Sequence, residues 1–300
     1  MKVVQLLKRL FGRIVPRRRP RPASKPPAWG APPSSLSHYD LEERMGAGGM
    51  GTVYRAVDRR SGANVAIKIL HAHLQSTPAY LERFHREAEI ASKLDSRYMV
   101  RVLDSGSDRG HQFIVSEFVG GAKLGDVLRQ GRLEIVEALA VAAQIAHALE
   151  EAALQGVIHR DIKPDNIMFT QGGSIKVADF GISRLADATT VTLTGMFVGT
   201  MAYTAPEQAR GHADIRSDIY SLGITLFEML TGDVPFHSET PTGLMRMHED
   251  DPPPLDRLEG MPDPDRWAAD AAAWETQQIP YERAYALMRE GEASLAVWEW

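Results

Sequence analysis

The residues best suited to chemistry lie between positions 159 and 207. In the segment HRDIKPDN, Asp161 supplies a carboxylate of the kind that serves as a base, and Lys163 supplies a cation two residues later. Asn166 adds an amide oxygen, and Asp179 in DFG adds a second carboxylate at a turn. Such oxygen ligands suit a hard ion like Mg²⁺. Together these groups can place a metal-bound triphosphate against a hydroxyl group.

A glycine cluster lies upstream, in the segment YDLEERMGAGGMGTVYRAVD. Apolar and polar residues alternate there as in strands, and Gly46, Gly48, Gly49 and Gly51 interrupt the alternation. Glycines let the backbone approach phosphates and direct N–H groups at them. Because the loop leads into the strand-like TVYRAV and not into a helix, the pattern argues against a dinucleotide-binding site.

A strand, VAIKIL, and a helix follow the glycine cluster. Lys68 lies among apolar neighbours in the strand. Residues 78–94 have helical spacing, with an apolar stripe beside which Glu87 lies. The stripe consists of Leu81, Phe84, Ala88, Ala91 and Leu94. Two further strands are expected after this helix, around residues 99–104 and 111–118.

Taken together and in order, the glycine loop, the VAIK lysine, HRDIKPDN, DFG and APE resemble the eukaryotic-type protein kinase family in its bacterial serine/threonine branch. The resemblance implies an α+β, two-lobed fold with a small β-rich N-lobe and a helical C-lobe. It also implies transfer of the γ-phosphoryl group of ATP to serine and threonine hydroxyls of proteins. Lys163, together with Thr200 in GTMAYTAPE, points away from a tyrosine kinase.

The resemblance assigns the chemistry as follows. Asp161 orients the hydroxyl and accepts its proton late, and Lys163 approaches the γ-phosphate. Lys68 holds the α- and β-phosphates and pairs with Glu87, or with Glu89 if the register slips. The metal ligands for Mg²⁺ are Asn166 and Asp179.

ATP is expected to contact the glycine loop, the neighbouring strands and the segment that links the lobes. These positions are Met45, Gly46, Ala47, Gly48, Gly49, Met50, Gly51, Thr52, Val53, Ala66, Lys68, Glu117 and Val119. Ser116 is the expected gatekeeper at the back of the adenine pocket, and residues 117–119 form the expected hinge.

The segment after DFG is rich in hydroxyl groups, and two of its threonines are expected to be autophosphorylated. Thr192 and Thr194 lie eight and six residues before Thr200, where bacterial relatives carry phosphate. Arg160 precedes the base, and kinases with this arginine commonly pair it with a phosphorylated residue.

Two apolar helices are expected in the C-lobe. One covers residues 133–155 and ends at Gly156, and the other covers roughly residues 214–230 and is apolar all round, which predicts burial. Asp218 is the polar exception in the second helix. The resemblance implies that it braces the backbone of HRD, because an unpaired buried carboxylate is costly.

Charge divides the chain unequally. Residues 1–37 carry nine lysines and arginines and no acidic residue, which leaves 25 basic and 39 acidic residues in the remainder. There is no cysteine, so disulfides and cysteine-bound metals are excluded, and a cytoplasmic location is expected. No nucleic-acid partner is expected.

The N-terminal leader has its own pattern. Residues 2–15 form one apolar and one cationic helical face, which is typical of a segment that lies in a membrane interface. We expect residues 1–25 to contact anionic lipid at the inner membrane face. The alternative is a basic leader without function.

The expected domains are a leader over residues 1–37, a kinase domain over residues 38–260 and a C-terminal piece over residues 261–300. The kinase domain divides into an N-lobe (38–119) and a C-lobe (120–260) whose late helices are expected to be missing. Residues 261–300 resemble helical repeats of large bacterial regulators and suggest a truncated or fused reading frame. The alternative function is therefore an inactive or weakly active ATP-binding scaffold.

Overall fold

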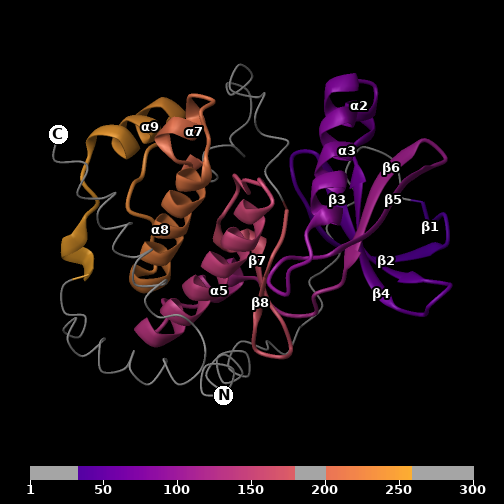
Figure 1. Cartoon of the computed structure of the whole chain (residues 1–300), viewed down its shortest axis with the longest axis horizontal. Coiled ribbons are helices and arrows are strands. Elements are labelled where there is room, and N and C mark those ends of the chain that lie inside the picture. The colour runs from indigo at the N-terminus through magenta and orange to yellow at the C-terminus, as the bar shows by residue number, and fades with distance from the viewer. Residues whose placement is uncertain (1–32, 180–200, 259–300) are drawn as a thin grey trace. The chain divides into compact units, whose positions relative to one another are not determined.

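The computed structural model describes residues 33–179 and 201–258. They form two compact units. The first consists of residues 33–120, and the second consists of residues 121–179 and 201–258. The first unit is a sheet with two helices, and the second is mainly helical (Figure 1). Each unit is described separately below.

The first unit contains one antiparallel sheet of six strands, in the order β1-β2-β3-β4-β6-β5. The strands are β1 (Ser35–Leu36), β2 (Tyr39–Ala47), β3 (Gly51–Asp58), β4 (Asn64–Leu70), β5 (Val102–Asp108) and β6 (His111–Glu117). The apolar and polar alternation read from the sequence is the signature of such strands.

The register of the central strands decides which side chains share a face. Val53 lies opposite Lys68, Lys68 lies opposite Ile114, and Ala66 lies opposite Ser116. Because side chains alternate along a strand, all five project from the same face. The register therefore brings together four of the residues that the resemblance assigns to ATP or its pocket: Val53, Ala66, Lys68 and Ser116.

Helices α2 (Ala72–Gln75) and α3 (Pro78–Lys93) pack on this face. The cluster that joins them to the sheet contains Leu70, Leu74, Phe84, Ala88 and Ile114. The opposite face carries a second core that includes Leu36, Ile67 and Val115. Helix α3 ends one residue before the end predicted from the sequence.

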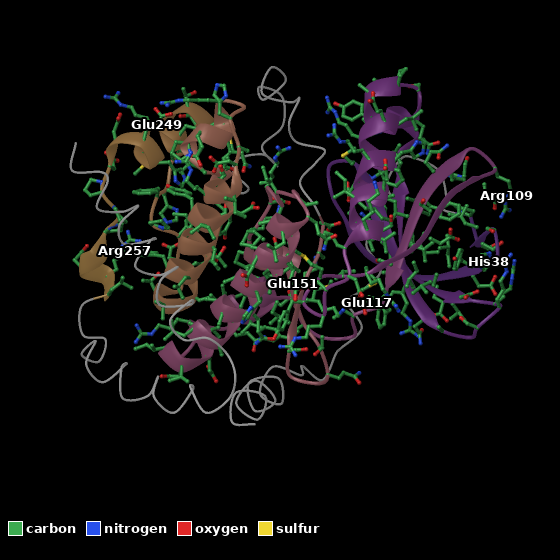
Figure 2. The ribbon with its side chains drawn as sticks, viewed as in Figure 1. His38, Arg109, Glu117, Glu151, Glu249 and Arg257 are labelled. Carbon is green, nitrogen blue, oxygen red and sulfur yellow. The ribbon has the colours of Figure 1, made fainter. Side chains whose placement is uncertain are left out.

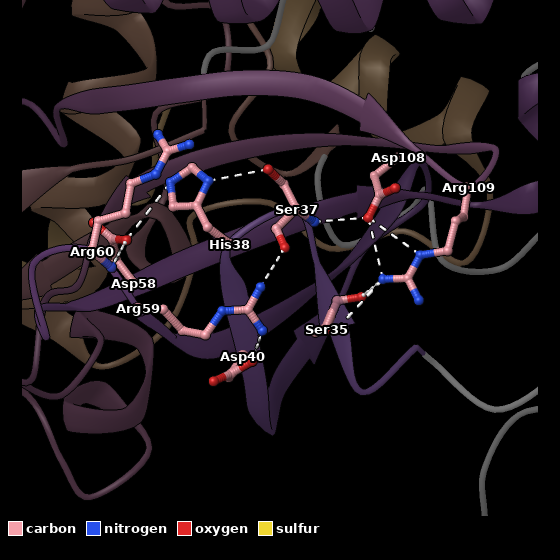
Figure 3. A network of polar contacts seen from close by, with 9 residues as sticks. All are labelled: Ser35, Ser37, His38, Asp40, Asp58, Arg59, Arg60, Asp108 and Arg109. Atoms are coloured by element: carbon pink, nitrogen blue, oxygen red, sulfur yellow. Dashed lines mark hydrogen bonds and ion pairs between the residues drawn. The ribbon is translucent and has the colours of Figure 1, made fainter.

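A network of polar contacts holds β1 to the turn between β5 and β6 (Figure 3). Arg109 donates to the carbonyl oxygen of Ser35 at 2.5 Å, and the backbone N–H of Ser37 donates to Asp108 at 2.7 Å. Leu36, between the two serines, is fully buried. The sheet therefore begins at Ser35, three residues before the boundary at 38 that the motifs suggested.

The second unit begins with α4 (Leu124–Leu128) and the long helix α5 (Ile135–Leu154). Glu134 and Glu137 form a capping box at the start of α5, and Gly156 follows its end with φ of 70°, a conformation that favours glycine. A 3-10 helix, η1 (Pro164–Asn166), leads into the hairpin of β7 (Ile167–Phe169) and β8 (Ile175–Val177).

Helix α8 (Ile215–Thr231) packs against α5 (Figure 1). Asp214 caps its N-terminus, and Gly232 ends it with φ of 87°. The shorter α7 (Pro206–Ala209), α9 (Pro241–Asp250) and the 3-10 helix η4 (Leu255–Leu258) complete the described part of this unit. The sequence reading predicted α8 within one residue at each end.

Two elements depart from the sequence reading. A strand was expected around residues 99–104, but a turn from Ser96 to Met99 occupies its start, so that β5 begins at Val102. Helix α9 was not predicted, although Thr240 at its N-cap followed by Pro241 is a recognised start signal. Within the described ranges, no helix has both the length and the apolar character needed to cross a bilayer.

Candidate functional site

Lys68 and Glu87 form an ion pair inside the first unit. The ammonium nitrogen of Lys68 lies 2.6 Å from Oε1 of Glu87, and the glutamate is buried. The sheet register turns Lys68 toward α3, and the helical period puts Glu87 on the buried side of that helix. Glu89, the alternative partner, is exposed and pairs with Lys93 at 2.7 Å. The geometry therefore selects Glu87.

The glycine-rich loop joins β2 to β3. Its turn is closed by a hydrogen bond from the N–H of Gly48 to the carbonyl of Gly51 at 2.9 Å. Gly51 passes so close to β4 that an added Cβ would lie 2.5 Å from the carbonyl oxygen of Ile69. Gly48 and Gly49 have open space where a Cβ would be, so packing alone does not require glycine at either position.

The predicted gatekeeper and hinge lie at the end of β6. Ser116 is partly buried, and its hydroxyl lies 3.5 Å from the carbonyl oxygen of Ala66, at the limit of a hydrogen bond. Glu117, labelled in Figure 2, accepts a hydrogen bond from the N–H of Arg101 and donates its own N–H to the Arg101 carbonyl. Val119 is buried. The gatekeeper and hinge roles stay predictions.

The backbone of the catalytic loop, which we define as residues 159–166, is held by Asp218 of α8. One carboxylate oxygen accepts the N–H of His159 at 2.7 Å, and the other accepts the N–H of Arg160 at 2.6 Å. Arg160 has φ of 67°, a left-handed conformation that is uncommon for a side chain larger than glycine. The two hydrogen bonds offset part of this strain. This is the bracing role expected for Asp218.

The side chains of Asp161, Lys163 and Asn166 converge within the catalytic loop. Lys163 approaches the two carboxylate oxygens of Asp161 at 3.1 and 3.0 Å. The amide nitrogen of Asn166 donates to the same carboxylate at 2.7 Å and to the Asp161 carbonyl at 2.8 Å. Two donor groups, which make three hydrogen bonds to it, thus fix the orientation of a buried carboxylate, as a positioned base requires.

The two predicted metal ligands lie on connected segments. The carbonyl of Asn166 accepts the N–H of Ala178 at 2.8 Å, which ties the residue before Asp179 to the catalytic loop. The side-chain nitrogen of Asn166 is used by Asp161, and this leaves its oxygen to serve as a ligand. Asp179 is exposed and has φ of 57°. An amide oxygen and an accessible carboxylate fit the donor set that Mg²⁺ prefers.

Several contacts around APE were not found from the sequence. The hydroxyl of Ser217 donates to Glu207 at 2.6 Å, and Gln208 donates to the carbonyl of Arg160 at 2.9 Å. Nothing in the sequence around Ser217 indicated that its hydroxyl would bind the glutamate of APE.

A second set of contacts joins the segment after position 200 to α8. Tyr203 donates to the carboxylate of Glu228 at 2.6 Å, and the hydroxyl of Ser221 donates to the carbonyl of Tyr203 at 2.7 Å. Burial raises the pKa of Glu228, with the Tyr203 hydrogen bond opposing that rise. The predicted phosphorylation sites Thr192 and Thr194, as well as Thr200, lie outside the described residues.

A family model for the protein kinase domain matches residues 39–275. The chain therefore belongs to the protein kinase domain family. The match extends past residue 260, where the kinase domain was expected to end.

Curated relatives and a solved structure agree with this family. The chain is 41% identical over 239 residues to the serine/threonine-protein kinase PknB of Mycobacterium leprae, covering 77% of this chain and 38% of the relative. It is 41% identical over 223 residues to PknA of Mycobacterium tuberculosis, covering 72% of this chain and 52% of the relative. This chain thus spans about half or less of the length of these relatives.

The crystal structure of a mutant PknI kinase domain from Mycobacterium tuberculosis is similar with a TM-score of 0.57 and 28% identity. The similarity covers 69% of this chain and 81% of that chain. The α+β kinase fold and the bacterial serine/threonine branch predicted from the motifs are confirmed.

Gly51→Ala is expected to lower the free energy of unfolding by about 1 to 3 kcal/mol, because the new Cβ would collide with the backbone of β4. Gly49→Ala is the matched control, since its Cβ would meet no atom within 4 Å, and we expect a change within about 0.5 kcal/mol. Denaturant unfolding measures both. Equal losses in the two variants would contradict the close approach of Gly51 to β4.

The stability of the second unit should carry a pH dependence from Asp218. Burial raises its pKa to about 6, against the opposing effect of the N–H donors of Arg160 and His159. Because the folded-state pKa exceeds the unfolded value, the folded protein binds more protons between about pH 4 and pH 6. This carboxyl's contribution to stability therefore grows as the pH falls through that window, and is lost as the pH rises above it.

The measurement compares melting temperatures of the wild-type protein and Asp218→Asn, which does not titrate. The difference should move in favour of the wild-type protein between pH 7.5 and pH 5. If the variant does not fold, a ¹³C NMR titration of the Asp218 carboxyl replaces it. A carboxyl pKa near 4, or a constant difference in melting temperature, would contradict the argument.

Proposed function

We propose that this chain is a protein serine/threonine kinase that transfers the γ-phosphoryl group of ATP to serine and threonine hydroxyls of proteins. The observation that carries the proposal is the orientation of the Asp161 carboxylate by Lys163 and Asn166. A carboxylate can align a substrate hydroxyl for attack only when its own orientation is fixed. The curated relatives that bear the name serine/threonine-protein kinase support the choice of substrate hydroxyl.

In the proposed reaction, Asp161 accepts a hydrogen bond from the substrate hydroxyl and takes its proton late. The hydroxyl oxygen forms a bond to the γ-phosphorus, the bond to the β,γ-bridging oxygen breaks, and ADP leaves with that electron pair. Lys163, which lies 3.0 Å from Asp161, is close enough to offset negative charge on the transferring group. Little covalent chemistry falls to the protein, so positioning and charge stabilisation dominate.

Asn166 and Asp179 would hold Mg²⁺, which neutralises charge on the phosphates when bound. In the first unit, Lys68 would contact the α- and β-phosphates. Its pairing with buried Glu87 fixes the position of the ammonium group. The glycine-rich loop would approach the phosphates through backbone N–H groups, and the backbone of residues 117–119 would meet adenine.

Asp179→Asn is expected to reduce phosphoryl transfer by at least about 100-fold, because a charged metal ligand is lost. Because Asp179 is exposed, the melting temperature of the Asp179→Asn variant should differ little from that of the wild-type protein. Lys68→Met should also abolish transfer, but it leaves Glu87 buried without this partner and should lower stability as well. Incubation with labelled ATP and Mg²⁺ measures transfer.

Two charge-matched controls accompany these variants. Lys93→Met removes an exposed lysine of α3. Asp40→Asn removes a half-exposed aspartate of β2, which pairs with Arg59 away from the proposed site. Both should transfer phosphate at the wild-type rate. Substantial activity in Asp179→Asn would show that the metal assignment is mistaken.

The second candidate is an inactive or weakly active ATP-binding scaffold, which the expected absence of the late C-lobe helices favours. Nucleotide binding without transfer in the wild-type protein would establish it. For the active protein, we propose autophosphorylation on Thr192 and Thr194. Mass spectrometry that finds phosphate only at other residues would exclude these two sites.

We further propose that residues 1–25 bind an anionic membrane surface and bring the kinase to the inner face of the membrane. The protein should sediment with anionic vesicles at low salt and be released at high salt, because lysine and arginine attraction is screened. A variant that lacks residues 1–25 is the control. Equal sedimentation with neutral vesicles would contradict the proposal.

The remaining domain assignments are also proposals. Residues 261–300, which lie outside the described residues, would form a helical repeat-like piece that follows the kinase domain. Limited proteolysis that separates residues 261–300 from an intact fragment containing residues 35–258 would support this division. An intact fragment that extends to residue 275, where the kinase family match ends, would contradict it.

A further inference from the structure

His71 lies between β4 and α2 and contacts the glycine-rich loop at several points. Its backbone N–H donates to the carbonyl of Met50 at 2.9 Å. Its ring nitrogen Nε2 lies 3.2 Å from the hydroxyl of Thr52, at the start of β3. A hydrogen bond also joins the ring to the backbone of Gly49. Backbone and side chain of one residue thus reach three positions of the loop.

The loop needs such a support because its glycines supply no side chains. Gly48 and Gly49 have no atom within 4 Å of the Cβ position, so neither is enclosed by neighbours. Gly51 is the position where the chain comes against β4. Met50 packs against the cluster beneath α2 and α3. His71 contacts the same short segment through hydrogen bonds, which are directional.

The surroundings of His71 favour the neutral ring. Burial lowers the pKa of His71, and the positive charges of His73 and Arg44 lower it further, while the hydrogen bond to Gly49 opposes them. The His73 ring stacks on the His71 ring with centroids 5.6 Å apart. A neutral imidazole has one donor and one acceptor nitrogen, which matches a hydroxyl and a backbone carbonyl.

We infer that His71 is a positioning residue that fixes the segment Met50–Thr52 of the glycine-rich loop at the end of β4 and thereby sets the affinity for ATP. The inference rests on the proposed function in one respect, namely that this loop covers the phosphates of ATP. His71 contacts the loop, and its proposed role is to hold that loop in position.

The test compares His71→Ala, His71→Gln and His85→Ala in the full chain. His85 is the matched control, because it lies on α3 in the same unit and pairs with Gln112 on the surface. We expect His71→Ala to raise the KM for ATP and the Kd for ATP about 3- to 10-fold, a typical loss for one or two hydrogen bonds. The kcat should stay within about twofold.

Two further arms separate positioning from general support of the fold. His71→Gln, whose amide reaches toward Thr52 and is both donor and acceptor, should recover most of the ATP affinity. In a Thr52→Val background, His71→Ala should have a smaller effect, because one of its contacts is already absent. A lower melting temperature with no rescue by glutamine would indicate a purely structural role and overturn the inference.

The Kd measurement does not depend on phosphoryl transfer. If the wild-type protein binds ATP but transfers no phosphate, the proposed function fails while the effect of His71 on the Kd is still decided. Equal Kd values for the wild-type protein, His71→Ala and His85→Ala would overturn the inference alone. Absence of ATP binding by the wild-type protein would overturn both.

Discussion

The buried carboxylate of Asp218 organises the catalytic loop. It accepts the N–H groups of two consecutive residues, His159 and Arg160, the second of which has a positive φ. The carboxylate comes from a helix whose other buried positions are largely apolar, so its desolvation is expensive and its two donors matter all the more. These two hydrogen bonds hold the backbone from which Asp161 extends, and Asn166 adds a third through the Asp161 carbonyl.

Each unit also contains another buried polar side chain that is paired with a partner from a neighbouring element. Glu87 is buried on a helix that packs on the sheet, where Lys68 of β4 meets it. Gln144 of α5 is buried too, and its side chain accepts the N–H of Ile175 while donating to the carbonyl of Ala140. These contacts fix the spacing between elements, since each fails if a helix shifts by one residue.

Much of this arrangement could be predicted from the sequence, because it depends on short periods and contiguous motifs. Lys68 faces α3 because side chains on a strand alternate with a period of two residues. Glu87 faces Lys68 because side chains on a helix repeat with a period of 3.6 residues. The catalytic loop is a continuous motif, so the neighbourhood of Asp161 and Asn166 follows from it. The outer ends of elements were less predictable, as the late start of β5 at Val102 shows.

The contacts that were not predicted join segments far apart in the chain, and the residues that make them belong to no recognised motif. Ser217 meets Glu207 only because α7 and α8 are packed together, and a serine at a helix N-terminus is ordinarily read as a local cap. His71 follows a predicted strand, but its ring carries no signal of the loop that it supports. Helix α9 had a start signal, yet its apolar positions were too few to stand out.

The burial of Leu36 has a practical consequence for defining the boundary of the folded domain. The match to the protein kinase domain family starts at residue 39, yet Leu36 fills the core beside Ile67 and Val115. A shortened version of the chain that starts at residue 39 would expose apolar side chains and lose the edge strand that covers them. Deleting a buried leucine side chain typically costs about 2 to 5 kcal/mol, a large share of the stability of a small domain. Any independently expressed domain should therefore retain Ser35, Leu36 and the residues that hold them.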